Sequence, residues 1–153
     1  MQKIAIYFII LLSSLMAHCQ LPCGIYDDAM RIRMIEEHVF TITKSMNFIK
    51  QNQGIEDQSF QIVRWTMSKE EHAQEIQNII SEYFLTQRIK INSEDSLYLQ
   101  KIQILHAILV DAMKCKQTID TANANNLLSN LNSFVNLYFD EHGKTHLNDL
   151  KNK

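Results

Sequence analysis

Four residues near the beginning of the chain could perform metal chemistry: His18, Cys19, Cys23 and Tyr26, in the segment His-Cys-Gln-Leu-Pro-Cys-Gly-Ile-Tyr. If the chain is cleaved after Ala17, His18 becomes its first residue. The segment then offers a free amine, an imidazole, a backbone amide and two thiolates within nine residues. Thiolate and nitrogen donors in a plane suit nickel(II) or copper(II) better than magnesium or calcium. We therefore interpret residues 18–26 as a metal-binding hook.

Residues 1–17 have the composition of a cleaved secretory leader. Lys3 supplies a positive charge, and a mostly apolar run of twelve residues follows, from Ile4 to Leu15. A transmembrane helix needs about 20 apolar residues, so this run fits a signal peptide better than a membrane anchor. We expect cleavage by a processing peptidase, a periplasmic or secreted location, and no membrane attachment of the mature form. An uncleaved anchor is the alternative.

The composition of the remaining chain favours one domain of ordinary size. Removal of 17 of the 153 residues leaves 136, which is enough for a single substantial core. The loss of Lys3 leaves 14 basic residues against 17 acidic ones, so the formal charge is near −3. This balance argues against nucleic acid as a partner.

Apolar residues recur at spacings of three and four in four segments, as one buried face of a helix requires. Helices are predicted from Asp27 to a break at residues 52–54, from about residue 60 to Gln87, from about Ser93 past Ala112, and after Asp120. Short connections between them predict an antiparallel up-down-up-down four-helix bundle over residues 27–153. The predicted stripes are Ile32, Ile35, Val39, Ile42, Met46 and Ile49; Phe60, Val63, Met67, Ala73, Ile76, Ile80 and Tyr83; Tyr98, Ile102, Leu105, Leu109 and Ala112; and Leu127, Leu131, Phe134 and Tyr138.

The interior of this bundle is not expected to hold a metal. Di-iron bundles use Glu-x-x-His on their core faces, and none of the five histidines beyond the hook has Glu three residues before it. We expect Cys115 to be a small buried thiol. His38, His72 and His106 are expected to be partly buried or at the surface, and His142 and His146 to lie in a solvated, fraying C-terminus.

A disulfide between Cys19 and Cys23 is the structural alternative to metal binding. Export favours the oxidation of thiols. However, this bridge would close a loop of about five residues and constrain little of the unfolded chain. Amines and thiols both lose protons readily beside a divalent ion, so the metal interpretation uses more of the donors that are present.

The hook resembles the mature N-terminus of the nickel-dependent superoxide dismutases, which begins His-Cys-x-x-Pro-Cys-Gly-x-Tyr. The matching residues are His18, Cys19, Pro22, Cys23, Gly24 and Tyr26. Ser81, Tyr83 and Phe84 resemble a Ser-x-Tyr-Phe motif at the end of that family's second helix. By its helix pattern the resemblance covers the whole chain after the leader, and it implies a four-helix bundle that assembles as a homohexamer.

The resemblance also implies a ligand set and a reaction. The amine of His18, the backbone nitrogen of Cys19 and the thiolates of Cys19 and Cys23 would surround Ni(II) in a plane. The imidazole of His18 would join as an axial ligand in Ni(III). Superoxide would both reduce Ni(III) and oxidise Ni(II), which yields dioxygen and hydrogen peroxide. Tyr26 would lie over the open face of the metal, with Tyr83 as a neighbour.

Two positions depart from the pattern of that family. Gln20 replaces an acid, and Met34 stands where a glutamate of the first helix holds the axial imidazole. Glu36 or Glu37 could take over that task. An arginine also helps to hold the imidazole in the family, and the candidates in this chain are Arg31, Arg33 and Arg64.

Two other classes of function are compatible with the same residues. A non-catalytic nickel or copper sequestration protein could use the same hook, although Tyr26 and the imidazole of His18 favour turnover over storage. A structural bundle that carries a disulfide and no metal is the third interpretation.

Overall fold

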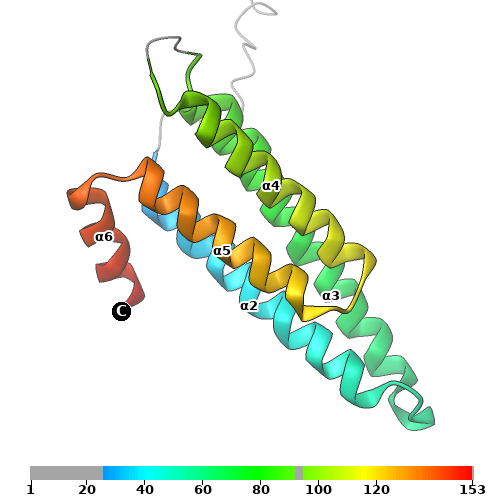
Figure 1. The fold of residues 1–153 in the computed structure, drawn as a ribbon. Coiled ribbons are helices and arrows are strands. Elements are labelled where there is room, and N and C mark those ends of the chain that lie inside the picture. The colour runs from blue at the N-terminus through cyan, green and yellow to red at the C-terminus, as the bar shows by residue number, and fades with distance from the viewer. Residues whose placement is uncertain (1–25, 92–94, 153) are drawn as a thin grey trace, which may run out of the picture.

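The computed structural model describes residues 26–91 and 95–152, and this part of the chain contains helices and no strand (Figure 1). The predicted leader and most of the hook, including His18, Cys19 and Cys23, lie outside the described residues, as does Ser93. The elements are α2 (Asp28–Asn52), the 3-10 turn η1 (Glu56–Gln58), α3 (Ser59–Asn78), the π-helix η2 (Ile79–Arg88), α4 (Tyr98–Gln117), α5 (Thr121–Tyr138) and α6 (Glu141–Lys151).

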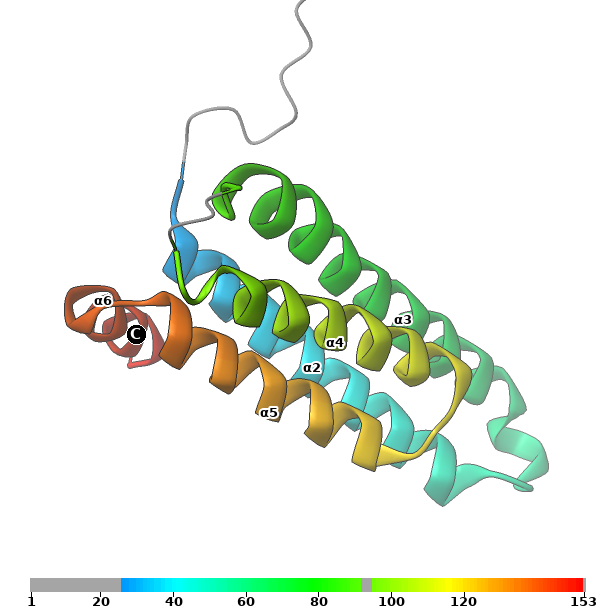
Figure 2. The same ribbon diagram turned by 45° about the horizontal axis from the view of Figure 1, so that its top comes forward.

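Helices α2 to α5 form an antiparallel bundle in which α3 continues directly into η2. Each helix packs against the next along the chain, and α5 packs back against α2 (Figures 1 and 2). The prediction of an all-helical bundle is confirmed. None of the helices in the described ranges is long and apolar enough to span a membrane.

Aspartates determine where three of the helices begin. Asp27, Asp120 and Asp140 precede α2, α5 and α6, and each carboxylate accepts a hydrogen bond from a backbone N–H two or three residues later, at 2.8 to 3.0 Å. Such caps satisfy amide groups that have no partner in the first turn of a helix. The cap of α2 therefore fixes the residue that directly follows the hook.

The predicted stripe of α2 is buried along its whole length. Its members, each 6% exposed or less, are Ile32, Ile35, Val39, Ile42, Met46 and Ile49. The facing sides of the other bundle helices complete the core with Ile76, Ile80, Phe84, Leu105, Ile108, Ala112, Leu127, Leu131 and Phe134. Periodic burial of large apolar side chains is thus what holds the four helices together.

The first part of the predicted stripe on α3 is exposed. Phe60, Val63 and Met67 are 70%, 56% and 66% exposed, so the prediction that they belong to the core is wrong. The reason is that α4 ends at Gln117, level with Lys69. The part of α3 before Lys69 extends past the end of α4, so α2 packs beside it but α4 does not cover it (Figure 1).

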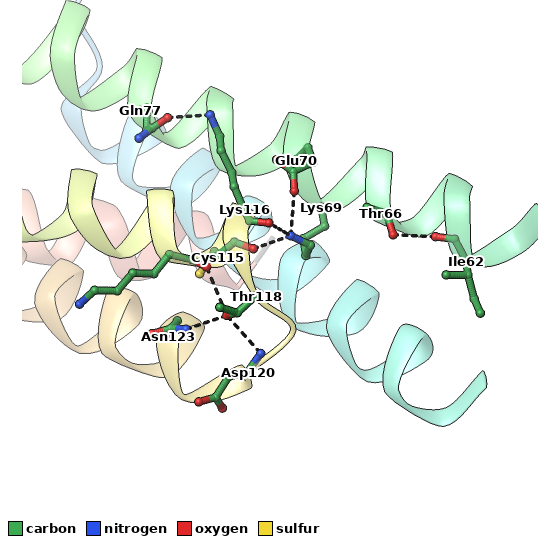
Figure 3. A network of polar contacts seen from close by, with 11 residues as sticks. Ile62, Thr66, Lys69, Glu70, Gln77, Cys115, Lys116, Thr118, Asp120 and Asn123 are labelled. Carbon is green, nitrogen blue, oxygen red and sulfur yellow. Dashed lines mark hydrogen bonds and ion pairs between the residues drawn. The ribbon is translucent and has the colours of Figure 1, made fainter. Parts of the chain in front are cut away.

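Lys69 closes the end of α4 from inside the bundle. Its side chain is 3% exposed, and its Nζ donates to the carbonyl oxygens of Cys115 (2.6 Å) and Lys116 (2.5 Å) and to Oε1 of Glu70 (2.9 Å) (Figure 3). The last carbonyls of a helix lack partners within it, and the helix dipole favours a positive charge there. Lys69 therefore joins α3 to the last turn of α4.

A short additional helix, α6, follows the bundle. The prediction of a fraying C-terminus at His142 and His146 is wrong, because both residues lie in α6. Leu147 of α6 is buried in the core, and Lys151 Nζ pairs with Glu36 Oε1 of α2 at 2.7 Å. Helix α6 lies beside the start of α2, at the end of the bundle where the chain arrives from the hook (Figures 1 and 2).

Candidate metal centre

Tyr26 and Asp27 are the first described residues, and they lie at the end of the bundle where α2 begins and α5 ends (Figure 2). Cys23 precedes Tyr26 by three residues, so chain geometry limits the distance between their Cα atoms to about 11 Å. The side chains around Tyr26 are therefore the described surroundings of the predicted metal centre.

Tyr26 contacts an aromatic ring and a guanidinium group. Its ring centroid is 6.0 Å from that of Tyr83, with 58° between the ring planes. Cζ of Arg88 lies 4.6 Å from the centroid of the Tyr26 ring, a position in which the cation is attracted by the electron-rich face. The structure thus brings the predicted residues Tyr26 and Tyr83 together, and it adds Arg88.

Asp28 is the hydrogen-bonding centre of this group of side chains. Its Oδ1 accepts a hydrogen bond from the hydroxyl of Tyr83 (2.5 Å). Its Oδ2 accepts from the hydroxyl of Tyr138 (2.8 Å) and from Nη2 (2.7 Å) and Nε (3.1 Å) of Arg88. We call Tyr26, Asp28, Tyr83, Arg88 and Tyr138 the Asp28 cluster. One carboxylate in this cluster ties the start of α2 to both η2 and α5.

The π-helix η2 explains how Tyr83 and Arg88 reach the same carboxylate. In an α-helix, residues five apart differ in direction by about 140°, because each residue turns the chain by about 100°. In a π-helix the hydrogen bonds join residues five apart, as in the bond from Ile89 N to the carbonyl of Phe84 at 2.8 Å. The wider turn brings residues five apart onto nearly the same face, so both side chains point toward Asp28.

The charges of the Asp28 cluster depend on one another. Burial alone would raise the pKa of Asp28, but hydrogen bonds from Arg88, Tyr83 and Tyr138 outweigh burial and hold this pKa below its ordinary value. Burial, together with the neighbouring carboxylate, raises the pKa of Tyr138 to about 12 and also raises the pKa of Tyr83. At neutral pH, Asp28 is therefore ionised and both phenols keep the protons that they donate.

Of the three arginines considered from the sequence, Arg31 is the one that contacts the cluster. Its Cζ lies 5.2 Å from the ring centroid of Tyr83. Arg33 is paired with acidic residues of its own helix. Arg64 lies on the part of α3 that extends past α4, toward the other end of the bundle. The structure therefore singles out Arg31 and the unpredicted Arg88 as the cations near Tyr26.

The two glutamates considered as substitutes for the acid of the family lie outside the cluster. Glu36 pairs with Arg33 at 2.5 Å and with Lys151 at 2.7 Å. Glu37 is exposed and lies 3.7 Å from Arg33. Met34, which stands at the position of the family glutamate, is partly buried and packs against the core. The partners of both glutamates are thus Arg33 and Lys151, which lie outside the Asp28 cluster.

The other histidines and Cys115 occupy structural positions. The Nδ1 atoms of His38 and His72 lie 2.7 Å apart, and burial together with the neighbouring His72 lowers the pKa of His38. His106 is exposed. Cys115 is buried as predicted, and burial raises the pKa of its thiol to about 11, so it stays protonated at neutral pH.

The donors of the hook fit a nickel ion by their chemistry. Two thiolates, an amine, an amide nitrogen and an imidazole form a soft and nitrogen-rich set that suits nickel(II). Within residues 26–91 and 95–152, no three His, Cys, Asp or Glu side chains converge in a way that could hold a metal ion. His18, Cys19 and Cys23 are the residues that would hold the metal by their donor chemistry, and Tyr26 of the Asp28 cluster follows Cys23 by three residues.

Comparison with known families defines the class of this protein. The family model of the nickel-containing superoxide dismutases matches residues 13–142, a range that includes the hook and helices α2 to α5. The chain therefore belongs to the nickel-containing superoxide dismutase family. It is an oxidoreductase that uses nickel as its cofactor and superoxide as its substrate. No curated protein and no solved structure gives a significant match to the chain.

The sequence did not indicate the roles of Asp28, Arg88 and Tyr138. Tyr83, Arg88 and Tyr138 are 55, 60 and 110 residues away from Asp28 along the chain, so no short motif joins them. The position of Tyr138 at the end of an apolar stripe was one available signal. A half-buried tyrosine hydroxyl needs a hydrogen-bond partner, so a polar group could have been expected near it.

Proposed function

We propose that nickel held by His18, Cys19 and Cys23 at the mature N-terminus dismutates superoxide by cycling between Ni(II) and Ni(III). The family match that runs through the hook carries this proposal. The contact between Tyr26 and Tyr83 at the start of the bundle supports it. The metal supplies a one-electron couple, so that one superoxide is oxidised to dioxygen and a second takes up one electron and two protons to give hydrogen peroxide.

The bundle residues hold the aromatic side chains next to the hook in a fixed arrangement. Asp28 accepts a hydrogen bond from the Tyr83 hydroxyl and anchors the guanidinium of Arg88, which in turn lies over the ring of Tyr26. Such pre-organised groups limit the positions that a small substrate can take. Tyr26, which is 47% exposed, is the member of the cluster that a substrate from solvent can reach.

Arg31 is the side chain to which we assign the steering of superoxide. Arg88 is neutralised by its ion pair with Asp28. Arg31 instead lies over the ring of Tyr83, and its Nη1 donates to Sδ of Met34 at 3.6 Å. A cation near the site raises the rate at which an anion arrives, even on a protein of negative net charge.

We further propose that a processing peptidase removes residues 1–17, that the enzyme is exported, and that it assembles as a homohexamer. The composition of the leader supports cleavage and export. The exposed apolar side chains of Phe40, Phe60, Val63 and Met67 offer surface that neighbouring copies can bury. The mass of the mature protein by light scattering tests the assembly, and a monomer at micromolar concentration would contradict it.

The function is tested on a protein that begins at His18. We expect one nickel per chain and removal of superoxide. Cys19→Ser and Cys23→Ser should each lose nickel, because a neutral hydroxyl cannot replace a thiolate donor. A matched variant with one extra Ala before His18 should keep its helicity and lose activity, because the amine of His18 becomes an amide.

One result would contradict the redox proposal directly. If the protein with an authentic His18 terminus binds nickel but leaves superoxide untouched, the hook stores metal and does not turn over. Full activity in the variant with the extra Ala would show instead that the N-terminal amine is not a ligand.

A further inference from the structure

Helix α6 lies beyond the part of the chain that matches the family, and yet it packs beside the start of α2, where Asp27 contacts His146. The family match ends at residue 142, so nearly all of α6 (Glu141–Lys151) is additional to it. Leu147 is the one residue of α6 that is buried in the core. Leu150 packs against the core while partly buried, so two leucines supply the apolar contacts of α6, and its polar contacts to the beginning of α2 call for another explanation.

A histidine–carboxylate contact and a lysine–glutamate ion pair attach α6 to the beginning of α2. Nε2 of His146 lies 3.5 Å from Oδ1 of Asp27, and Nζ of Lys151 lies 2.7 Å from Oε1 of Glu36. The two contacts occur in the same order along both helices, so α6 runs parallel to the first turns of α2. Its contacts begin at Asp27, which together with Tyr26 forms the segment from which the hook extends. We call Tyr26 and Asp27 the hook root.

The hook root, the start of α2 and α6 also line an open, shallow pocket of about 300 Å³. Its lining includes Tyr26, Asp27, Phe139, His142, Gly143 and His146. Gly143 approaches Phe139 so closely that a Cβ at this position would clash with the ring of Phe139. The close corner between α5 and α6 sets the direction of α6, so one wall of this pocket is α6 and the other is the hook root.

We propose that α6 is a positioning element that holds the hook root and thereby tightens the binding of nickel by the hook. This inference rests on the proposed function, since it takes the hook as the metal site. Residues that are fixed before a ligand binds lose less conformational freedom on binding, and affinity rises accordingly. In the free chain, the contact between His146 and Asp27 restrains the hook root in this way.

His146 is the positioning residue of α6. Its partner atom, Oδ1 of Asp27, also accepts the capping hydrogen bond from Met30 N at 2.8 Å. Both side chains are about half exposed, and polar contacts between exposed side chains contribute little to global stability. Loss of His146 should therefore loosen the hook root without weakening the bundle, which distinguishes positioning from a merely structural role.

The first test compares His146→Ala with His142→Ala in the full apo protein that begins at His18. Both imidazoles are exposed and line the same pocket, but the ion pair with Asp27 belongs to His146. Amide hydrogen exchange between Tyr26 and Met30 should become several-fold faster in His146→Ala and stay unchanged in His142→Ala. His146→Gln, whose amide can donate to Asp27, should restore slow exchange. Equal exchange in all three variants and the wild type would overturn the proposal.

The second test measures nickel affinity by competition with a chelator. A chain that ends at Asp140 should bind Ni(II) about tenfold more weakly than the full chain, in the range found when supporting groups around a metal site are removed. Circular dichroism should show the loss of α6 alone. Equal nickel affinity in the two chains would overturn the role of α6. A full chain that binds nickel tightly but leaves superoxide untouched would overturn the proposed function instead.

Discussion

Asp28 is a partly buried charge in the first turn of α2, and Lys69 is a buried charge against the end of α4, but they are neutralised by different kinds of partner. Lys69 donates to two backbone carbonyls at the end of α4 and to Glu70. Asp28, in the first turn of α2, accepts from two phenols and a guanidinium. Along α3 and η2, the two sites are about 20 Å apart, since Tyr83 follows Lys69 by fourteen residues.

The difference between these partners makes the surroundings of Lys69 a structural site and those of Asp28 a functional one. Backbone carbonyls at a helix end cannot move without unfolding the helix, so Lys69 can contribute to stability alone. The partners of Asp28 are side chains, and one of them, Arg88, lies over Tyr26 next to the hook. A change at Asp28 can therefore alter the surroundings of the metal while the bundle stays folded.

The largest effect on stability is expected for Lys69→Met. This change keeps the length of the side chain but leaves the carbonyls of Cys115 and Lys116 without their donor. Each unsatisfied buried acceptor costs about 1 to 3 kcal/mol, so the free energy of unfolding should fall by about 2 to 4 kcal/mol in urea titrations. Superoxide removal per bound nickel should not change.

Lys116→Met is the matched control for this variant. The Nζ of Lys116 donates to the side chains of Gln74 and Gln77 at the surface, so its loss should cost less than about 1 kcal/mol. Equal stability of Lys69→Met and Lys116→Met would mean that the end of α4 does not depend on the buried ammonium.

Asp28→Asn should act mainly on function. Supporting residues around a metal site typically change affinity or activity by about 10- to 100-fold when they are replaced, and we expect a loss of this size in nickel affinity or in kcat/KM for superoxide. Asp111→Asn is the control, because Asp111 is a buried carboxylate that accepts a hydrogen bond from Asn130 between α4 and α5, away from the hook. Similar activity losses in both variants would remove the distinction between the two regions.

Cys115→Ser should have a smaller effect and only on stability. The thiol is buried, with a pKa raised to about 11 by burial, so it is neutral and not available as a nickel ligand. Burying a hydroxyl in its place costs about 1 to 3 kcal/mol if the hydroxyl finds no partner. Thermal unfolding measures this cost, and a loss of nickel from the variant would show that Cys115 is misassigned.

The weakest expected effect is a difference in acid sensitivity. The pKa of Asp28 is lower in the folded protein than its ordinary value, so the unfolded chain binds more protons at acidic pH. The stabilisation that Asp28 provides is complete above about pH 4 and is lost as the pH falls through the lower folded pKa. Between pH 5 and pH 3 the wild type should thus lose more stability in urea than Asp28→Asn does. An identical loss would show that Asp28 does not titrate as described.

The sequence predicted the four bundle helices because their burial follows a simple period. Ile32 to Ile49 on α2 and Leu127 to Phe134 on α5 are buried as the spacing required. The same period failed at Phe60, Val63 and Met67, because spacing shows that a helix has an apolar face but not where the partner helix ends. It also failed at α6, where a mainly polar segment is anchored by Leu147 and by ion pairs.

The predicted site residues have a different status. Tyr26 and Tyr83 were chosen by resemblance to a family, and the structure places their rings next to each other. The assignment of His18, Cys19 and Cys23 as ligands stays a prediction. The contact between Arg88 and Asp28 was not predictable from α-helical periodicity. The wider turn of the π-helix η2 places Arg88 on the same face as Tyr83, so both side chains reach Asp28.

The aromatic residues give the molecule a separate optical label at each end. Its single tryptophan, Trp65, stacks on Phe48 with ring centroids 5.2 Å apart. Trp65 precedes Tyr83 by eighteen residues, which corresponds to roughly 27 Å along a helix. Tyr26, Tyr83 and Tyr138 gather at the opposite end, around Asp28. Tyrosine absorbance should therefore respond when nickel enters the hook, while tryptophan fluorescence reports on the remote end, and a single unlabelled sample can show whether the two ends change together.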